Sequence, residues 1–229
     1  MNGPSPGAQV DHLVIAASSL EQGVAWCEAT LGVTPAAGGL HPLMGTHNRL
    51  LRLSGAAYPG SYLEIIAINP DAPDPGRSRW FDLDDAALQQ AVSDTPRLVH
   101  FVAATPSGQA AVRALSNLGI DRGVLIPIDR PSPAGLLRWQ ISVRDDGQRL
   151  FDGGLPTLIE WGALHPADRL PDDGVSLKSL AMSHPRAAEL QAAYDAIGMA
   201  GVTVRQGPPN LVATLSTPRG LVTLESKGA

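Results

Sequence analysis

The feature that most constrains the fold is an internal repeat. Residues 10–17 read VDHLVIAA and residues 99–104 read VHFVAA, so a His stands at the matching position of two apolar, strand-like segments. Each segment runs into a helix-like stretch that ends in Leu-Gly, and a strand that carries a Glu follows later, at Tyr62–Ile68 and at Thr157–Trp161. The chain therefore contains the same β-α-β-β-β unit twice, and a repeat of this kind has to be settled first because it fixes the topology.

Within the first unit, the local signals agree with one another. Strand alternation puts His12 and Val14 on one face. Ser18 or Ser19 then supplies a helix N-cap, and Gly32 suits the left-handed position that ends a helix. Apolar residues between these signals follow the spacing of one helix face, namely Leu20, Val24, Cys27 and Leu31. Cys27 is therefore expected to be buried.

The sequence pattern predicts that the chain is divided into four parts. We expect a first module at 9–69, a linker with a short helix at 70–97 that contains three prolines, and a second module at 98–162. A third, degenerate β-α-β-β-β-like unit follows at 175–227. It lacks the His that opens the other two units.

Composition excludes several classes of protein. The formal net charge of the 229 residues is −5 and no basic run occurs, which argues against a nucleic-acid partner. No segment approaches the ~18 apolar residues of a membrane span, and one cysteine excludes an internal disulfide framework, so a cytoplasmic protein is expected. Aromatic residues make up only 4% of the chain, which disfavours a site lined by aromatic rings.

The repeat and its motifs resemble the vicinal oxygen chelate superfamily, which includes glyoxalase I, extradiol dioxygenases and bleomycin-resistance proteins. More narrowly, the chain is similar to bacterial glyoxalase-like domain proteins over roughly residues 9–226. Four motifs carry the resemblance: Asp11-His12-Leu13-Val14, Gly45-Thr46-His47-Asn48, Tyr62-Leu63-Glu64 and Ile159-Glu160-Trp161.

The resemblance implies an α+β fold in which paired βαβββ modules form a curved mixed sheet, a cup with helices outside. It also implies one divalent metal ion, Zn, Ni, Mn or Fe, held by His12, Glu64, His100 and Glu160. The His-to-Glu separations are 64 − 12 = 52 and 160 − 100 = 60 residues. The extra residues of the second module would be absorbed in the loop at 148–154. The partner would be a small-molecule substrate, and a homodimer is possible.

Such a metal would act as a Lewis acid and stabilise an enediolate, giving lyase or isomerase chemistry on a small vicinal-oxygen substrate. Glu64 or Glu160 would serve as the base, and the sequence does not choose between them. One alternative is a cup that binds a small molecule without metal or turnover, as in antibiotic-sequestering relatives. Another is an Fe(II) ring-cleaving dioxygenase that uses His12, His100 and Glu160 as its metal triad. Glutathione dependence is left open.

Further residues are expected near the ligand. The four that would contact it are Thr46, Asn48, Tyr62 and Arg138. Arg138 would clamp a substrate carboxylate, with a surface ion pair as the alternative. His41 and His47 are alternative metal ligands on a loop. Trp161 is expected in the core, on the strand face opposite Glu160.

Overall fold

The computed structural model describes residues 7–53, 55–132 and 135–228 of the chain. Its strands are β1 (Gln9–Ala16), β2 (Ala36–His41), β3 (Thr46–Arg52), β4 (Tyr62–Ile68), β5 (Arg97–Ala104), β6 (Val124–Ser132), β7 (Gly135–Val143), β8 (Thr157–Trp161), β9 (Ser176–His184), β10 (Val202–Gln206), β11 (Asn210–Thr217) and β12 (Gly220–Glu225). Its helices are α1 (Leu20–Leu31), α2 (Ala86–Ser93), α3 (Gly108–Ser116), α4 (Ala187–Ile197) and the short 3-10 turns η1 (Trp80–Asp82) and η2 (Pro166–Asp168).

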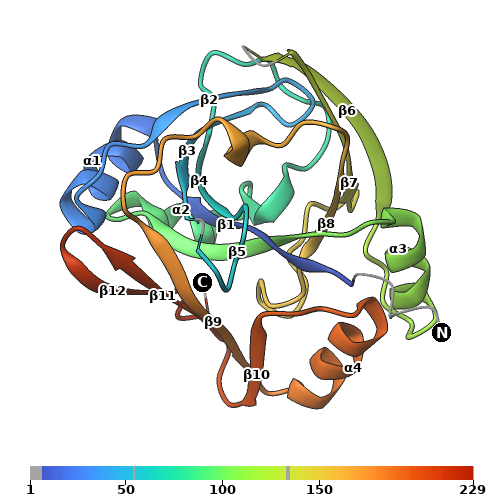
Figure 1. Cartoon of the computed structure of the whole chain (residues 1–229). Coiled ribbons are helices and arrows are strands. Elements are labelled where there is room, and N and C mark those ends of the chain that lie inside the picture. Colours follow the sequence, from blue (N-terminus) through green and yellow to red (C-terminus); the bar gives the residue numbers. More distant parts are fainter. Residues whose placement is uncertain (1–6, 54, 133–134, 229) are drawn as a thin grey trace.

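One curled sheet contains both repeats. Its strand order is β2-β3-β4-β1-β5-β8-β7-β6, so each module supplies four adjacent strands. The two modules join where β1 pairs antiparallel with β5, while β1 with β4 and β5 with β8 are parallel pairs. Figure 1 shows that the sheet is strongly curled and that α1 and α3 lie outside it. The predicted fold class, paired βαβββ modules in a curved mixed sheet, is confirmed.

Helix α1 begins and ends at the residues that the sequence indicates. The side chain of Ser19 accepts a hydrogen bond from the backbone N–H of Gln22, which satisfies one of the free amides at the helix N-terminus. Gly32 ends the helix with φ of 78°, a left-handed conformation that costs glycine little. Cys27 is buried, as expected.

The two faces of the sheet have separate apolar cores. On the outer face Leu13, Ile15 and Phe101 pack with residues from the C-terminal part of the chain. On the inner face Val14, Ile66, Val102 and Ile159 pack with side chains of the linker. Those linker side chains are Trp80, Phe81, Leu83, Leu88 and Val92. The linker is therefore more than a connection, because it fills much of the cup.

The third unit forms a second, smaller sheet with strand order β10-β9-β11-β12. With α4 between β9 and β10, it repeats the β-α-β-β-β order of the modules. Figure 1 shows it lying against the convex side of the large sheet, with α4 near α3. Leu177, Met182 and Leu215 share the outer core with Leu13 and Phe101, so the two sheets enclose one apolar layer.

The hydroxyl of Tyr58, in the loop between β3 and β4, is one of several groups that join the third unit to the rest of the chain, and we expect the two to unfold together. Tyr58 donates to the carbonyl of Gly201 at 2.7 Å and accepts from the N–H of Leu180 at 3.1 Å. Tyr58→Phe leaves both groups without this partner, so we expect the free energy of unfolding to fall by about 1–2 kcal/mol. Urea denaturation followed by circular dichroism and tryptophan fluorescence should give one coincident transition in both proteins.

The matched control removes a hydroxyl from an exposed position of the same small sheet. Thr203→Val on β10 should leave the urea midpoint unchanged. A separate early transition in either protein would show that the third unit unfolds by itself, and an unaltered midpoint for Tyr58→Phe would show that the hydroxyl contributes no stability.

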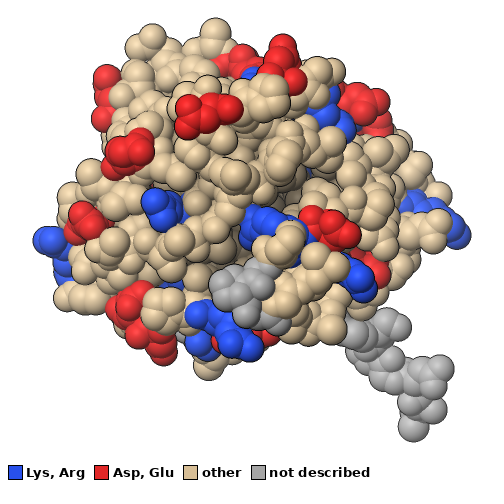
Figure 2. Space-filling model, turned by 90° about the horizontal axis from the view of Figure 1, so that it is seen from above, with Lys and Arg blue, Asp and Glu red and all other residues tan. Residues whose placement is uncertain are grey.

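In the part of the chain that is described, no helix is both long enough and apolar enough to cross a membrane. Figure 2 shows Lys and Arg scattered singly among Asp and Glu on the face seen from above. That view shows no continuous basic stripe, which agrees with the negative net charge of the chain.

Candidate active site

The pairing of β1 with β4 brings a histidine and a glutamate together in the cup. His12 lies beside Tyr62 in the register and Val14 lies beside Glu64, so His12 and Glu64 share the inner face. Nε2 of His12 lies 3.5 Å from Oε2 of Glu64, and the two residues are 4% and 6% exposed. The Tyr62 ring stacks on the imidazole with centroids 4.5 Å apart. A buried acid–base pair of this kind is a candidate site for proton transfer.

A bulge in β1 adds a second carboxylate to this pair. Between Val10 and His12 the strand advances two residues while β5 advances one, which leaves Asp11 as the extra residue. The bulge lets Asp11 face the same region as His12, its neighbour. Oδ1 of Asp11 accepts from Nδ1 of His12 at 2.6 Å, and Oδ2 accepts from Trp161 at 2.8 Å and from His165 at 3.0 Å.

These contacts set the charge of His12. His165 accepts the N–H of Ala167 at Nδ1, so its Nε2 carries the proton and donates to Asp11. Burial alone would raise the pKa of Asp11, but hydrogen bonds from the two histidines lower it, so Asp11 is a carboxylate. Burial likewise lowers the pKa of His12, but the carboxylates of Asp11 and Glu64 outweigh it and raise that pKa to about 9. His12 is therefore an imidazolium at neutral pH.

A chain of polar contacts fixes the Glu64 carboxylate. Its Oε1 accepts from Nδ2 of Asn48 at 2.6 Å, and the amide oxygen of Asn48 accepts from the backbone N–H of Gly39 at 2.7 Å. His41 lies next to Asn48 and bonds to Thr46 through Nδ1 at 3.0 Å. Burial lowers the pKa of His41 to about 4, so it is neutral. With Oε1 held, Oε2 of Glu64 is the oxygen left to face His12 or a ligand.

The pair borders a small cavity that opens toward a larger one. The inner cavity has a volume of about 40 Å³, and the outer one, at the mouth between β2 and β6, has about 420 Å³. The two cavities share His41, Trp80, Arg130 and Trp139. The outer cavity therefore lies next to the small cavity that borders His12 and Glu64.

The few aromatic residues of the chain are concentrated here. Three of its four tryptophans line the inner cavity, namely Trp80, Trp139 and Trp161. Phe81 lines it too. The composition-based argument against an aromatic site is wrong for this reason. Trp161 packs against the inner core as expected, but it is only partly buried, because it also lines the cavity and bonds to Asp11. Phe81, at η1, holds φ of 62°, an uncommon value for a bulky residue that is often found at functional sites.

The second module does not repeat the His/Glu pair. In the parallel pairs, Val14 lies beside Glu64 and Val102 lies beside Thr157, so Thr157 is the structural equivalent of Glu64. His100 accepts the backbone N–H of Thr157 at Nε2, at 3.1 Å, and donates from Nδ1 to the carbonyl of Gly153 at 2.9 Å. Burial, together with Arg122, lowers the pKa of His100 well below its usual value. His100 is neutral, and its one ring lone pair is already used.

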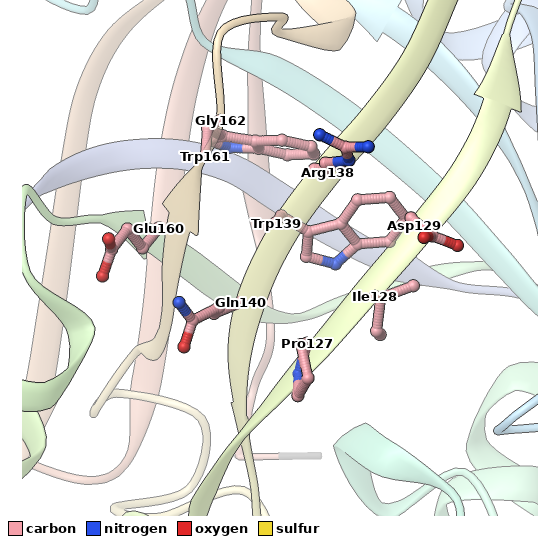
Figure 3. Close-up of a pocket in the computed structure, with 9 residues that line it drawn as sticks. All are labelled: Pro127, Ile128, Asp129, Arg138, Trp139, Gln140, Glu160, Trp161 and Gly162. Carbon is pink, nitrogen blue, oxygen red and sulfur yellow. The ribbon is translucent and has the colours of Figure 1, made fainter.

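Glu160 lies three residues beyond the equivalent position, on the other face of β8. Its Oε2 accepts from the backbone N–H of Gly108, at the first residue of α3, at 2.8 Å. Figure 3 shows its carboxylate directed away from the indole rings of Trp139 and Trp161. Arg138 and Glu160 line a third cavity, of about 500 Å³, which does not include His12 or Glu64.

The structure therefore does not assemble the predicted metal set. Members of the superfamily commonly bind divalent metals. Here His12 and Glu64 meet, but His100 has no free lone pair and Glu160 faces outward. On the side of the second module, the inner cavity is lined by Trp139, Ile141, Ile159 and Trp161, which supply no metal ligand. Among the described residues, no group of three or more His, Cys, Asp or Glu could hold a metal ion.

Asn48 and Tyr62 line the inner cavity with His12 and Glu64, whereas Thr46 bonds to His41 and does not line it. Other neighbours of the pair were missed. Asp11 was overlooked because strand alternation assigns it to the opposite face, and only a bulge reverses that. His165 and Arg130 come from segments with no motif. Among the described residues, Nη1 of Arg130 and Nε1 of Trp80 are buried and have no hydrogen-bond partner.

Comparisons with known proteins assign the chain to a family. A glyoxalase-like domain model matches residues 10–198, and the chain belongs to that family. Its resemblance to the vicinal oxygen chelate superfamily is thereby confirmed. No curated protein matches the chain.

Solved structures match the chain at low sequence identity. A hypothetical protein from Staphylococcus aureus matches with a TM-score of 0.58 at 12% identity, covering 95% of this chain and 85% of that one. Methylmalonyl-CoA epimerase from Mycobacterium tuberculosis has a TM-score of 0.40 at 16% identity, over 70% of this chain and 91% of that one. The Streptomyces coelicolor epimerase, in complex with 2-nitronate-propionyl-CoA, has a TM-score of 0.42 at 17% identity, over 70% and 99%.

Proposed function

We propose that the chain is an isomerase or lyase that moves a proton at a carbon next to a carbonyl group of a small vicinal-oxygen compound. Glu64 is the base and His12 is the acid. The observation that supports this most directly is the buried imidazolium–carboxylate pair, 3.5 Å apart, at the end of a cavity.

The reaction balances with these two groups alone. The C–H bond beside the carbonyl breaks and its proton passes to Oε2 of Glu64, while the electron pair shifts to make an enolate oxygen. Nε2–H of His12 donates to that oxygen and stabilises its charge. If a proton returns to the same carbon, the hydrogen is exchanged or the configuration is inverted. If a proton is added to the neighbouring carbon instead, the compound is isomerised. If a leaving group departs from the enolate, the reaction is that of a lyase.

The environment of Glu64 suits this role once a ligand is bound. Burial raises the pKa of Glu64, but contact with His12 lowers it below its usual value. A substrate that enters between the two side chains weakens that contact, so the carboxylate becomes more basic when the reacting carbon is present. Asp11 meanwhile holds Nδ1 of His12 and keeps the ring oriented.

No step in this proposal passes through a metal. The Zn, Ni, Mn or Fe ion expected from the sequence needs ligands from both modules. In the second module, the free lone pair of His100 already accepts a hydrogen bond, and Glu160 lies on the outer face of the sheet. The dioxygenase alternative requires the same two residues and loses its support in the same way.

A binding protein without turnover is the second candidate. Three tryptophans around one cavity provide apolar area for an organic ligand. The aromatic content of only 4% did not indicate this concentration. This alternative predicts ligand binding with no chemical change of the ligand.

Solvent deuterium exchange tests the proposal. The protein is incubated in D₂O with small carbonyl compounds (pyruvate, 2-oxobutyrate, hydroxyacetone and dihydroxyacetone), and loss of the proton signal is followed by NMR. We expect at least one compound to exchange faster than with heat-denatured protein, and the rate to fall above pH of about 9 as His12 loses its proton. Treatment with EDTA should not change the rate. Binding without exchange would support the second candidate, and exchange that EDTA abolishes and Ni²⁺ or Zn²⁺ restores would support the metal-dependent reading.

A further inference from the structure

We propose that Arg130 and Trp80 form an anion subsite at the mouth of the cup, and that the molecule bound there carries a carboxylate. This inference rests on the proposed function for the identity of the reacting end, but the subsite itself is argued from different residues. It narrows the substrate class to small organic acids that bear a carbonyl or hydroxyl group.

Two buried donors without partners indicate the subsite. Among the residues described, Nη1 of Arg130 and the indole N–H of Trp80 are buried and donate no hydrogen bond to the protein. A buried donor left unpaired destabilises the protein, and more so when it is charged. Both residues line the inner and the outer cavity, so one ligand oxygen or oxygen pair can reach them there.

The fold leaves space for the Arg130 guanidinium at this point. Arg130 is on β6 and Gly39 is on β2, the two edge strands of the curled sheet. A Cβ on Gly39 would overlap the guanidinium group, so glycine allows the arginine to lie across the gap between the edges. The guanidinium also lies over the Trp139 ring, 5.9 Å from its centroid. The guanidinium is therefore held by packing on two sides, and Nη1 is its atom nearest to Gly39.

The charges around the outer cavity favour a monoanion. Arg130 is its only cation-bearing lining residue among those described, Asp129 adds a carboxylate, and His41 is neutral because burial lowers its pKa to about 4. A planar carboxylate matches the guanidinium fork and carries one charge. A phosphate dianion would meet Asp129 and Glu64 with less compensation.

Matched acid and amide ligands test the subsite without turnover. Dissociation constants are measured by titration calorimetry for phenylacetate and phenylacetamide, lactate and lactamide, and 2-oxobutyrate and 2-oxobutyramide, with inorganic phosphate as a further probe. The acids should bind about tenfold or more tightly than the amides, as expected for a charge-assisted hydrogen bond. Arg130→Met should abolish this preference and leave amide binding unchanged.

Two further variants separate charge, position and folding. Arg130→Lys keeps the charge without the planar fork, and Gly39→Ala keeps the arginine but displaces it, so each should reduce the preference partly. Arg205→Met, at an exposed position of β10, removes the same charge elsewhere and should change nothing.

Equal binding of acids and amides by the wild-type protein, or tighter binding of phosphate than of any carboxylate, overturns the subsite. Either result leaves the exchange experiment on neutral ketones unaffected. Conversely, acid preference that depends on Arg130, in a protein that exchanges no proton, supports the subsite and removes the enzymatic role.

Discussion

Replacing Glu64 by glutamine is expected to lower the rate of deuterium exchange by about 10³-fold, the loss usual for a general base. The Glu64→Gln variant would keep the size of the side chain and an oxygen that can accept from Asn48, but its amide cannot take a proton. Glu160→Gln is expected to leave the rate unchanged, because the Glu160 carboxylate caps α3 on the outer face of β8. Rates for the three proteins are measured by NMR on the same carbonyl compound.

This pair of variants distinguishes the site formed by His12 and Glu64 from the set of metal ligands predicted from the sequence. If Glu160 were a ligand or the base, its replacement would be as damaging as that of Glu64. Circular dichroism and the urea midpoint of each variant show whether it is folded. A Glu64→Gln protein that is folded and exchanges at the wild-type rate would leave the proposed base without a role.

The fold could be predicted well because both repeats carry the same local signals. Apolar strands that open with His, the cap at Ser19 and the left-handed Gly32 all depend on neighbours in sequence. The pairing of β1 with β5 follows from the duplication. The linker was harder to place, because the burial of Trp80 and Phe81 inside the cup depends on contacts that no local pattern encodes.

The part of the candidate site in the first module could be predicted, but the part expected from the second module could not, because of the strand register. His12 and Glu64 could be paired because the first module has a simple parallel register. Matching the second module by residue type selected Glu160, whereas the register assigns Thr157 to that position. Because successive residues in a strand face opposite sides, an offset of three residues moves a carboxylate from the cup to the outer face.

Irregular backbone accounts for what the sequence did not reveal. Asp11 joins the site through a bulge, and His165 joins it from the turn after β8. Arg130 reaches the mouth because the opposite edge strand carries Gly39 there. Each of these positions depends on closure of the sheet, which composition and periodicity do not specify.

The charge of His12 predicts that the protein loses stability as pH rises through the alkaline range. The pKa of His12 is raised from 6.5 to about 9, although burial opposes this, because Asp11 and Glu64 stabilise the imidazolium. A group whose pKa is higher in the folded state contributes stability that is fully present below its unfolded pKa and is lost as pH rises through its folded pKa. The shift corresponds to about 3 kcal/mol in the free energy of unfolding, lost progressively from pH about 6.5 to above about 9.

Urea denaturation of the wild-type protein and of His12→Gln across this range measures the effect. The variant should be less stable near neutral pH and should lose little with rising pH, so the difference between the two proteins should shrink as the imidazolium loses its proton. Taking the difference removes contributions common to both proteins, such as the buried Cys27 thiol, whose pKa burial raises to about 12. Parallel curves would mean that His12 is neutral in the folded protein. A neutral imidazole whose Nδ1–H is bound to Asp11 presents a lone pair at Nε2, so it could not donate the proton to an enolate. The stability measurement therefore tests the acid of the proposed reaction without any substrate.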